Sequence, residues 1–260
     1  MNRIDQLFQI KQHEILSVYF TAGHPELNSA PVIIKALAEA GVDMIEIGMP
    51  FSDPMADGPV IQQSSSKALK NGMSLNLLFE QLKDIRSKVR VPLLLMGYLN
   101  PVLQYGMERF CQSCARVGID GIILPDLPLE VYENEYKPFF IKAGLHNIFL
   151  ISPQTSEARL QALDNAGSGF LYFVSSSSTT GMKNGFTGEQ TAYFEKISRH
   201  NLKNHSLIGF GISNHDTFAT VCRYASGAII GSAFVKMLSE VEMTGVVEKI
   251  YKFVEPLKGP

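Results

Sequence analysis

One alternation runs along nearly the whole sequence: a short apolar stretch rich in β-branched residues, then a longer amphipathic stretch. Eight such apolar runs occur, at residues 15–20, 44–47, 92–96, 121–124, 148–151, 170–174, 207–210 and 228–230. Continuous hydrophobicity, rather than strict alternation with polar residues, is typical of parallel strands that are buried on both faces. The pattern therefore predicts eight strands of a parallel sheet.

Between these runs, apolar residues recur at helical spacing. They predict helices at residues 30–40, 75–87, 107–117, 131–143, 158–166 and 234–254, with an extra short helix at residues 3–11 before the first strand. Four of these stretches end directly before a glycine, namely Gly41, Gly118, Gly144 and Gly167. Because glycine accepts the left-handed conformation that ends a helix, we expect these four residues to reverse the chain.

Eight strand–helix units in a chain of 260 residues favour one α/β fold, a closed (β/α)₈ barrel of the TIM type. An open, doubly wound parallel sheet has the same periodicity and remains the alternative. No Pro/Ser-rich linker or change of composition divides the chain, so we expect a single domain over residues 1–260 rather than two small ones.

The composition argues against several classes of protein. Charged residues make up 18% of the chain and the formal net charge is −2, without the clustered Lys and Arg that phosphate neutralisation requires, so we expect no nucleic-acid partner. No apolar run approaches the ~18 residues of a membrane span. The first 13 residues carry charges and lack the apolar segment of a signal peptide. We therefore expect a cytoplasmic protein that does not enter a membrane.

Three cysteines, Cys111, Cys114 and Cys222, form an odd and sparse set that fits a reducing compartment. Cys111 and Cys114 make a C-x-x-C, but they lie inside a predicted helix and not at its start. Redox pairs sit at helix starts and zinc needs further ligands, so we interpret the two as small helix residues. The histidines are scattered along the chain without ligand spacing, and we expect no metal site.

In a barrel, reactive groups gather where strands end and in the loops that follow. Glu46 lies within the second apolar run, where burial would raise its pKa toward acid–base use; a structural ion pair is the alternative. Asp57 follows in a segment with three prolines, which hold the loop in shape. It is either a second reactive carboxylate or a turn-forming or helix-capping residue.

Glycines at the ends of the seventh and eighth runs suggest an anion site. Gly211 and Gly231 would let backbone N–H groups approach a ligand, and a short helix starting at Ser232 would add its positive dipole end. The loops after strands seven and eight are the usual phosphate seat of barrels. The polar segment 175–181 after the sixth run is either a lid or anion-binding loop, or a plain solvated linker.

Other common catalytic signals are missing from the sequence. It contains no G-x-S-x-G elbow and no Walker-type loop. No lysine stands at a strand end where a Schiff-base residue would be expected, which argues against lysine-dependent aldolases.

The segment IEIGMPFSDPMADGPVIQ at residues 45–62 closely resembles the signature of the tryptophan synthase α subunit family. Further matching segments are YFTAGHP at 19–25, MGYLNPV at 96–102, PDLPLE at 125–130, GFGIS at 209–213 and GSAFVK at 231–236. Together they cover nearly the full chain in order.

The resemblance implies a (β/α)₈ barrel that splits indole-3-glycerol phosphate into indole and glyceraldehyde 3-phosphate. It also implies an α₂β₂ complex with a β subunit, which carries the pyridoxal phosphate and receives the indole for L-tryptophan synthesis. This chain itself would hold no cofactor.

The resemblance also implies roles for individual residues. Glu46 would be the general acid–base and Asp57 would assist at the indole N–H. The phosphate would rest on Gly181, Gly211, Gly231 and Ser232, and the pocket and orienting residues would be Tyr19, Ile61, Tyr98, Tyr172, Thr180 and Phe210.

Three positions depart from the family pattern. His24 stands where the family usually has Asp, and Ser176 and Ser178 stand where it usually has an Arg and a Gly. Loss of a glycine would stiffen the sixth loop or change the timing of its closure.

Three other functions remain open. The first alternative is a stand-alone indole-releasing lyase. The second is a non-catalytic barrel that only activates its partner. The third is another phosphate-binding barrel, such as a sugar-phosphate aldolase or isomerase. The presence of both Glu46 and Asp57 argues against the last two.

Overall fold

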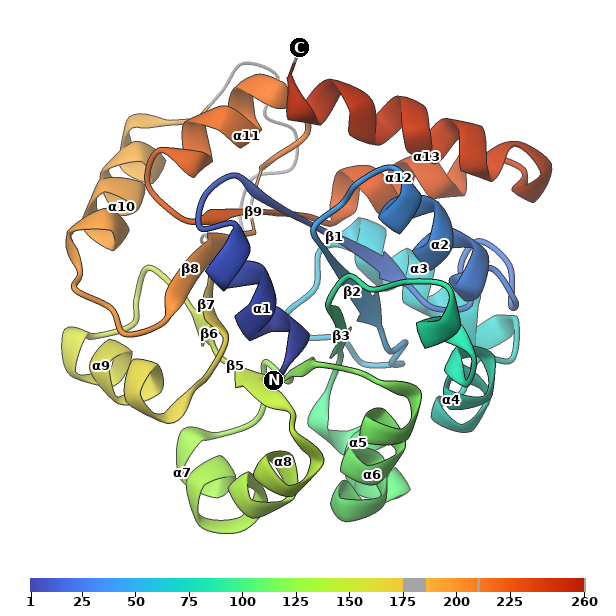
Figure 1. The fold of residues 1–260 in the computed structure, drawn as a ribbon, viewed down its shortest axis with the longest axis horizontal. Coiled ribbons are helices and arrows are strands. Elements are labelled where there is room, and N and C mark those ends of the chain that lie inside the picture. The colour runs from blue at the N-terminus through green and yellow to red at the C-terminus, as the bar shows by residue number, and fades with distance from the viewer. Residues whose placement is uncertain (175–185, 210, 260) are drawn as a thin grey trace.

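The structure is a computed structural model that describes residues 1–174, 186–209 and 211–259. Its parallel strands are β1 (Ile15–Thr21), β2 (Met44–Gly48), β3 (Leu93–Met96), β4 (Gly121–Ile123), β5 (His146–Ile148), β6 (Leu150–Ile151), β7 (Phe170–Phe173), β8 (His205–Ile208) and β9 (Gly227–Ile230). They form one sheet in the order β5-β4-β3-β2-β1-β9-β8-β7-β6. Figure 1 shows this sheet as a central ring surrounded by helices.

The ring closes because β5 and β6 are two halves of one barrel strand, separated by Phe149. β5 pairs with β4 and β6 pairs with β7. Across the break, the Tyr172 N–H donates to the Phe149 carbonyl at 3.0 Å and the Ser168 N–H donates to the Asn147 carbonyl at 3.3 Å. The predicted barrel of eight strands is thus confirmed, with its fifth strand interrupted, and the open sheet is wrong.

The helices surround the barrel as predicted for βα units. They are α1 (Arg3–Ile10), α2 (Ala30–Glu39), α3 (Pro59–Lys70), α4 (Leu75–Leu82), α5 (Leu99–Tyr105), α6 (Met107–Val117), α7 (Leu129–Val131), α8 (Lys137–Ala143), α9 (Glu157–Ala166), α10 (Gly188–Arg199), α11 (His215–Cys222), α12 (Ser232–Ser239) and α13 (Val246–Val254). The expected extra helix before the first strand is α1, whose first turn is capped by the Asn2 side chain.

Some predicted helix bounds were wrong. The stretch 234–254 is not one helix but α12, a short 3-10 turn at Met243–Gly245, and α13. The stretch 75–87 ends as α4 at Leu82, and a separate 3-10 turn follows at Ile85–Ser87. In both cases the apolar residues continue across the break because the successive segments bury their faces against the same core.

The glycine prediction holds at three of its four positions. Gly41, Gly118 and Gly144 have φ values of 81°, 80° and 68°, which reverse the chain after their helices. Gly167 instead is extended, and Gly169, with a φ of 84°, makes the reversal. Gly167 serves close packing, since an added Cβ would lie 3.1 Å from the Phe149 ring and 3.0 Å from a backbone oxygen.

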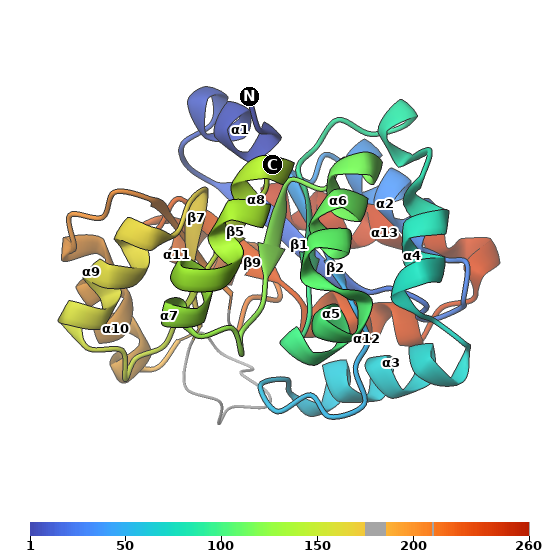
Figure 2. The same ribbon diagram turned by 90° about the horizontal axis from the view of Figure 1, so that it is seen from below.

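The core has two main parts. The larger cluster lies between the sheet and the helices and includes Cys111 and Cys114, which are buried and free within α6 as the sequence predicted. The smaller cluster fills the barrel and is extended at one end by Ile4 and Phe8 of α1. Figure 2 shows α1 at that end of the barrel and α3 at the other. Apolar side chains therefore fill the inside of the barrel at the end where α1 lies.

Candidate active site

Glu46 lies in the middle of β2, beside Tyr19 of β1 and Leu94 of β3 in the sheet register. Its side chain is fully buried. The Ser17 hydroxyl donates a hydrogen bond of 2.8 Å to Glu46 Oε1, whereas Oε2 has no hydrogen-bond partner among the described residues. No described cation forms an ion pair with Glu46, so the structure gives no support to the ion-pair alternative.

Burial raises the pKa of the Glu46 carboxyl to about 8, against the opposing effect of the Ser17 hydrogen bond. A buried carboxylate without a cation is unfavourable, so the proton is retained to higher pH. Near neutral pH the group is mostly protonated, yet it is close enough to its pKa to release the proton and take it back. The expected upward shift thus has a clear physical cause.

Asp57 lies in the segment between β2 and α3, and its side chain is half-buried. The Tyr98 hydroxyl donates to Asp57 Oδ2 at 3.0 Å, and Gln62 Nε2 donates to the Asp57 carbonyl at 2.8 Å. Partial burial raises the pKa of the Asp57 carboxyl, and the Tyr98 hydrogen bond opposes this. The N-cap of α3 is Gly58, without any side-chain cap, so Asp57 does not act as a helix cap.

Two buried tyrosines connect the surroundings of the two carboxylates. Burial is the main cause that raises the pKa of Tyr19 and of Tyr172, and the charges of both Glu46 and Asp57 add to it. Both carboxylates therefore lie within electrostatic reach of both phenols. Because Tyr19 is on β1 and Tyr172 on β7, the arrangement spans the barrel. No hydrogen bond joins Tyr172 to either carboxylate among the described residues.

Small residues make room for these phenols. A Cβ added at Gly48 would lie 2.1 Å from the Tyr19 hydroxyl, and one added at Gly209 would lie 2.2 Å from the Tyr172 ring. The sequence predicted no packing role for either Gly48 or Gly209. Their positions at strand ends could have suggested a role near the site. The tyrosines that they face, however, are identified only by the folded structure.

Ile61 of α3 packs with Tyr19 and Val235, as expected for a residue near the pocket. Its helix is attached to the barrel by a hydrogen bond of 2.7 Å between the Thr21 and Ser64 hydroxyls. That contact links α3 to the C-terminal end of β1 and keeps Ile61 beside Tyr19.

The predicted anion cradle lies at the same end of the barrel. Gly231 follows β9 and is the N-cap of α12, whose first residue is Ser232. Gly211 has a φ of 64°, which only glycine adopts readily. An added Cβ at Gly231 would lie 3.7 Å from the side chain of Tyr19, the residue that is paired with Glu46 in the sheet. Thr180, Gly181 and Phe210, and the departures Ser176 and Ser178, lie outside the described residues.

His24 is buried in the loop after β1. Its Nε2 lies 3.0 Å from the Ser239 hydroxyl, at the C-terminal end of α12. Burial, with the nearby positive charge of Lys67, lowers the pKa of His24 to about 4. The residue that replaces the usual Asp is therefore neutral at pH 7 and contacts the helix that begins at Ser232.

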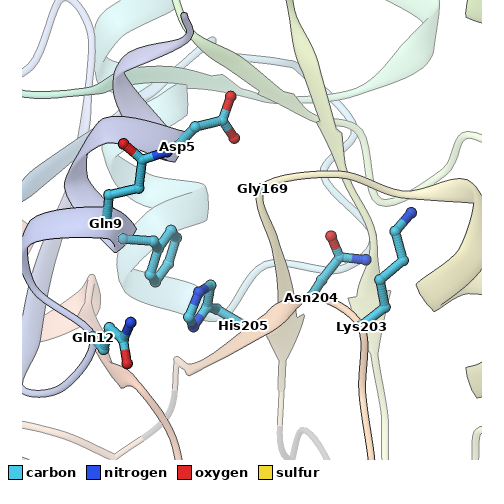
Figure 3. Close-up of a pocket in the computed structure, with 8 residues that line it drawn as sticks. Asp5, Gln9, Gln12, Gly169, Lys203, Asn204 and His205 are labelled. Carbon is cyan, nitrogen blue, oxygen red and sulfur yellow. The ribbon is translucent and has the colours of Figure 1, made fainter.

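A separate hollow of about 320 Å³ lies at the opposite end of the barrel, next to α1 (Figure 3). It is lined by Asp5, Phe8, Gln9, Gln12, Gly169, Lys203, Asn204 and His205. Several of these residues are at the starts of β7 and β8 and not at their ends. The Phe8 ring stacks on His205 at 4.0 Å, which fits a role in attaching α1 to the barrel floor.

In residues 1–174, 186–209 and 211–259, no group of three or more His, Cys, Asp or Glu side chains is arranged to hold a metal ion. In the same ranges, no helix is long and apolar enough to cross a membrane.

Comparisons with known proteins identify the relatives of this chain. A family model described as tryptophan synthase alpha chain matches residues 6–258. The tryptophan synthase alpha chain of Flavobacterium johnsoniae is 58% identical over 240 residues, which cover 92% of this chain and 94% of the relative. That of Flavobacterium psychrophilum is 55% identical over 257 residues, which cover 99% of this chain and all of the relative.

Solved structures show the same fold. The tryptophan synthase alpha chain of Legionella pneumophila superposes with a TM-score of 0.87 at 31% identity, covering 99% of this chain and 96% of that one. A chain from the Pyrococcus furiosus tryptophan synthase α₂β₂ complex gives a TM-score of 0.88 at 34% identity, covering 96% of this chain and all of that one. With sequence and fold in agreement, the chain belongs to the tryptophan synthase alpha chain family.

Proposed function

We propose that this chain cleaves indole-3-glycerol phosphate into indole and glyceraldehyde 3-phosphate, as a carbon–carbon lyase. The observation that carries the proposal is the environment of Glu46. It is a fully buried carboxyl with a pKa of about 8 and one oxygen without a partner among the described residues. A second carboxylate, Asp57, acts electrostatically on the same two tyrosines, Tyr19 and Tyr172. An acid in a dry site is suited to protonating a carbon atom.

The proposed reaction begins when Glu46 donates its proton to indole C3, which turns the ring into a cationic indolenine. The Glu46 carboxylate then takes the proton of the side-chain hydroxyl next to the bond that breaks. The oxygen forms the aldehyde, and the electrons of the C3–C bond return to the ring and restore the indole. Glu46 finishes protonated, so the cycle balances.

Asp57 would stabilise the positive ring through the indole N–H. The Tyr98 hydroxyl donates to the half-buried Asp57 side chain and favours its charged carboxylate form. Glu46 is more completely buried, which favours its protonated form. Two carboxyl groups in different environments can divide the roles of acid and anion. The positive ring would be stabilised most when the anion is already held in position.

The phosphate would bind to backbone N–H groups at Gly211, Gly231 and Ser232, together with Gly181. Support comes from the position of Gly231 and Ser232 at the start of α12, where helix N–H groups and the dipole favour an anion. The positions of Tyr19 and Ile61 beside this cradle support their role in lining the pocket for the indole.

We further propose that the chain works with a tryptophan synthase β subunit in an α₂β₂ complex and passes indole to it for L-tryptophan synthesis. Its relation to the chain from the Pyrococcus furiosus α₂β₂ complex supports this. The pyridoxal phosphate would belong to the β subunit, and this chain would need no cofactor of its own.

The test is indole release from indole-3-glycerol phosphate by the wild type and by the variants Glu46→Gln and Asp57→Asn. We expect each variant to lose roughly 10²-fold or more in kcat, as for general acid–base groups. Asp53→Asn is a matched control, because Asp53 is an exposed carboxylate in the same segment. It should keep normal activity.

The same assay with and without a β subunit separates the alternatives. Strong activation by the partner supports an α subunit, and full activity alone indicates a stand-alone lyase. If Glu46→Gln leaves cleavage unchanged, the chain does not use this chemistry. If neither the wild type nor the variant releases indole, the chain acts only as an activator of its partner.

A further inference from the structure

Ser17 is a buried polar residue in the interior of the barrel. It lies on β1, two residues before Tyr19, and its side chain is fully buried. Its hydroxyl donates 2.8 Å to Oε1 of Glu46, on the neighbouring strand, and this is the one hydrogen bond that its side chain makes among the described residues. Ser17 is therefore tied to the carboxyl group that the proposed function uses.

The surroundings of Ser17 are apolar. The barrel interior is filled by residues such as Ile15 and Leu94, and Ser17 is paired in register with Met44. A hydroxyl in such a place is unfavourable unless it is hydrogen-bonded. An apolar side chain would serve packing equally well at this position, so the hydroxyl is explained by its contact with Glu46.

The contact makes the two oxygens of Glu46 unequal. Oε1 accepts the Ser17 hydrogen bond, whereas Oε2 is buried and has no partner among the described residues. A carboxyl that accepts a hydrogen bond on one oxygen carries its own proton more readily on the other. The single donor also restricts rotation of the carboxyl group about its last bond.

We propose that Ser17 is a positioning residue for proton transfer: it fixes the plane of the Glu46 carboxyl and leaves Oε2 as the atom that gives and takes the proton. The proposal rests on the proposed function, in which Glu46 is the acid–base. Ser17 has no part in bond formation, and it acts only through Glu46.

Two consequences distinguish this role from simple packing. The Ser17 hydrogen bond favours the charged form of Glu46, so its loss should raise the pKa of that carboxyl further. Loss of the anchor should also reduce the share of molecules with the carboxyl in the productive orientation. Both effects act on the proton-transfer step, so kcat should change and KM should not.

The test compares Ser17→Ala with Ser17→Thr, which keeps a hydroxyl. We expect the Ala variant to lose about ten-fold in kcat, with KM within about two-fold, and its alkaline pH limit to move to higher pH. The Thr variant should recover most of the activity and the original pH profile. Ser113→Ala is the matched control: Ser113 is also buried, but it is on α6 and bonds Tyr105 and not a carboxylate. It should behave as the wild type.

A direct titration complements the kinetics. Carbon-13 NMR of labelled Glu carboxyl groups follows Glu46, whose signal is assigned by its absence in Glu46→Gln. Its titration should move to higher pH in Ser17→Ala. Ser17→Ala added to Glu46→Gln should cause no further loss of activity, because the effect passes through Glu46.

The outcomes separate the two claims. If Glu46→Gln is inactive but the Glu46 titration and kcat are the same in Ser17→Ala as in the wild type, the role of Ser17 is overturned and the proposed function stands. If Glu46→Gln is fully active, the proposed function fails, and with it the catalytic role of Ser17, whatever the titration shows. Should Ser17→Ala not fold, Ser17→Cys, with a weaker donor of similar size, must move the pH limit in the same direction.

Discussion

The Tyr98 hydroxyl joins Asp57 to the backbone of its own segment: it donates to Asp57 Oδ2 at 3.0 Å and accepts from the Ala56 N–H at 2.9 Å. The ring of Phe51 lies beside Tyr98 with centroids 5.3 Å apart. One phenol from the end of β3 thus holds the loop after β2 and orients the carboxylate within it. The family resemblance implied that Tyr98 lines the pocket, and this contact gives it a more specific role.

Removing the hydroxyl should therefore reduce activity without damaging the fold. We expect Tyr98→Phe to lower kcat/KM for indole-3-glycerol phosphate about ten-fold, because the Asp57 carboxylate loses a donor and the loop loses an anchor. Steady-state kinetics measures this. Tyr105→Phe removes a comparable hydroxyl, bonded to Ser113 on α6, and should leave kcat/KM unchanged. Equal losses in the two variants would contradict the role of Tyr98.

The raised pKa of Glu46 also affects stability. Its folded pKa of about 8 lies above the ordinary value of 4.5, so between these pH values the folded protein binds more protons than the unfolded chain. The Glu46 contribution to the free energy of unfolding is therefore most favourable below about pH 4.5, falls as pH rises to about 8, and is then constant. Burial of the charged form makes this loss roughly 5 kcal/mol at most.

Glu46→Gln removes this dependence. We expect the variant to gain stability relative to the wild type as pH rises from 5 to 9, although it has lost activity. Urea unfolding at several pH values gives the difference between the two free energies. A difference that is constant with pH would mean that the Glu46 pKa is not raised.

The sequence predicted most of the barrel, since buried parallel strands have a continuous apolar pattern. It did not predict α3, whose sequence has three consecutive serines, Ser64–Ser66. Ser64 is buried because it bonds Thr21, a partner 43 residues away. The break at Phe149 was missed for a similar reason, because it depends on how two neighbouring strands pair and not on the local sequence.

In the candidate site, too, some residues could be identified from the local sequence and others only from the fold. Glu46 stood out as a carboxylate within an apolar strand, and Asp57 by its place among prolines. Ser17 gave no signal, because a single serine in a strand has no pattern to identify it. Its significance depends on the register that puts Tyr19 beside Glu46 and so brings Ser17 within reach of that carboxyl.

His24 should make the free energy of unfolding depend on pH below neutrality. Its pKa of about 4 lies below the ordinary value of 6.5, so the unfolded chain binds more protons between these values. The stability from neutral His24 is fully present above pH 6.5 and is lost as pH falls toward 4, by roughly 3 kcal/mol at most. We expect His24→Gln, which keeps a donor for Ser239, to lose less stability than the wild type between pH 7 and 4.5. Urea unfolding measures this, and His13→Gln, at an exposed histidine, should follow the wild type.

Asp120 should affect stability and not catalysis, because it lies before β4 at the N-terminal end of the barrel. Its buried carboxylate pairs with Arg86, accepts from Arg3 at 3.0 Å, and accepts from the Leu93 N–H at 2.9 Å. Replacing it with Asn leaves the half-buried Arg86 without its counter-ion, so we expect Asp120→Asn to lose about 3 kcal/mol of unfolding free energy. The values of kcat and KM should stay within two-fold of the wild type, because the residue lies at this end of the barrel.

Glu80→Gln, at an exposed ion pair with Lys83, should leave the unfolding midpoint unchanged. If Asp120→Asn lowers kcat while the midpoint stays the same, the division between a stabilising floor and a reactive opposite end is wrong.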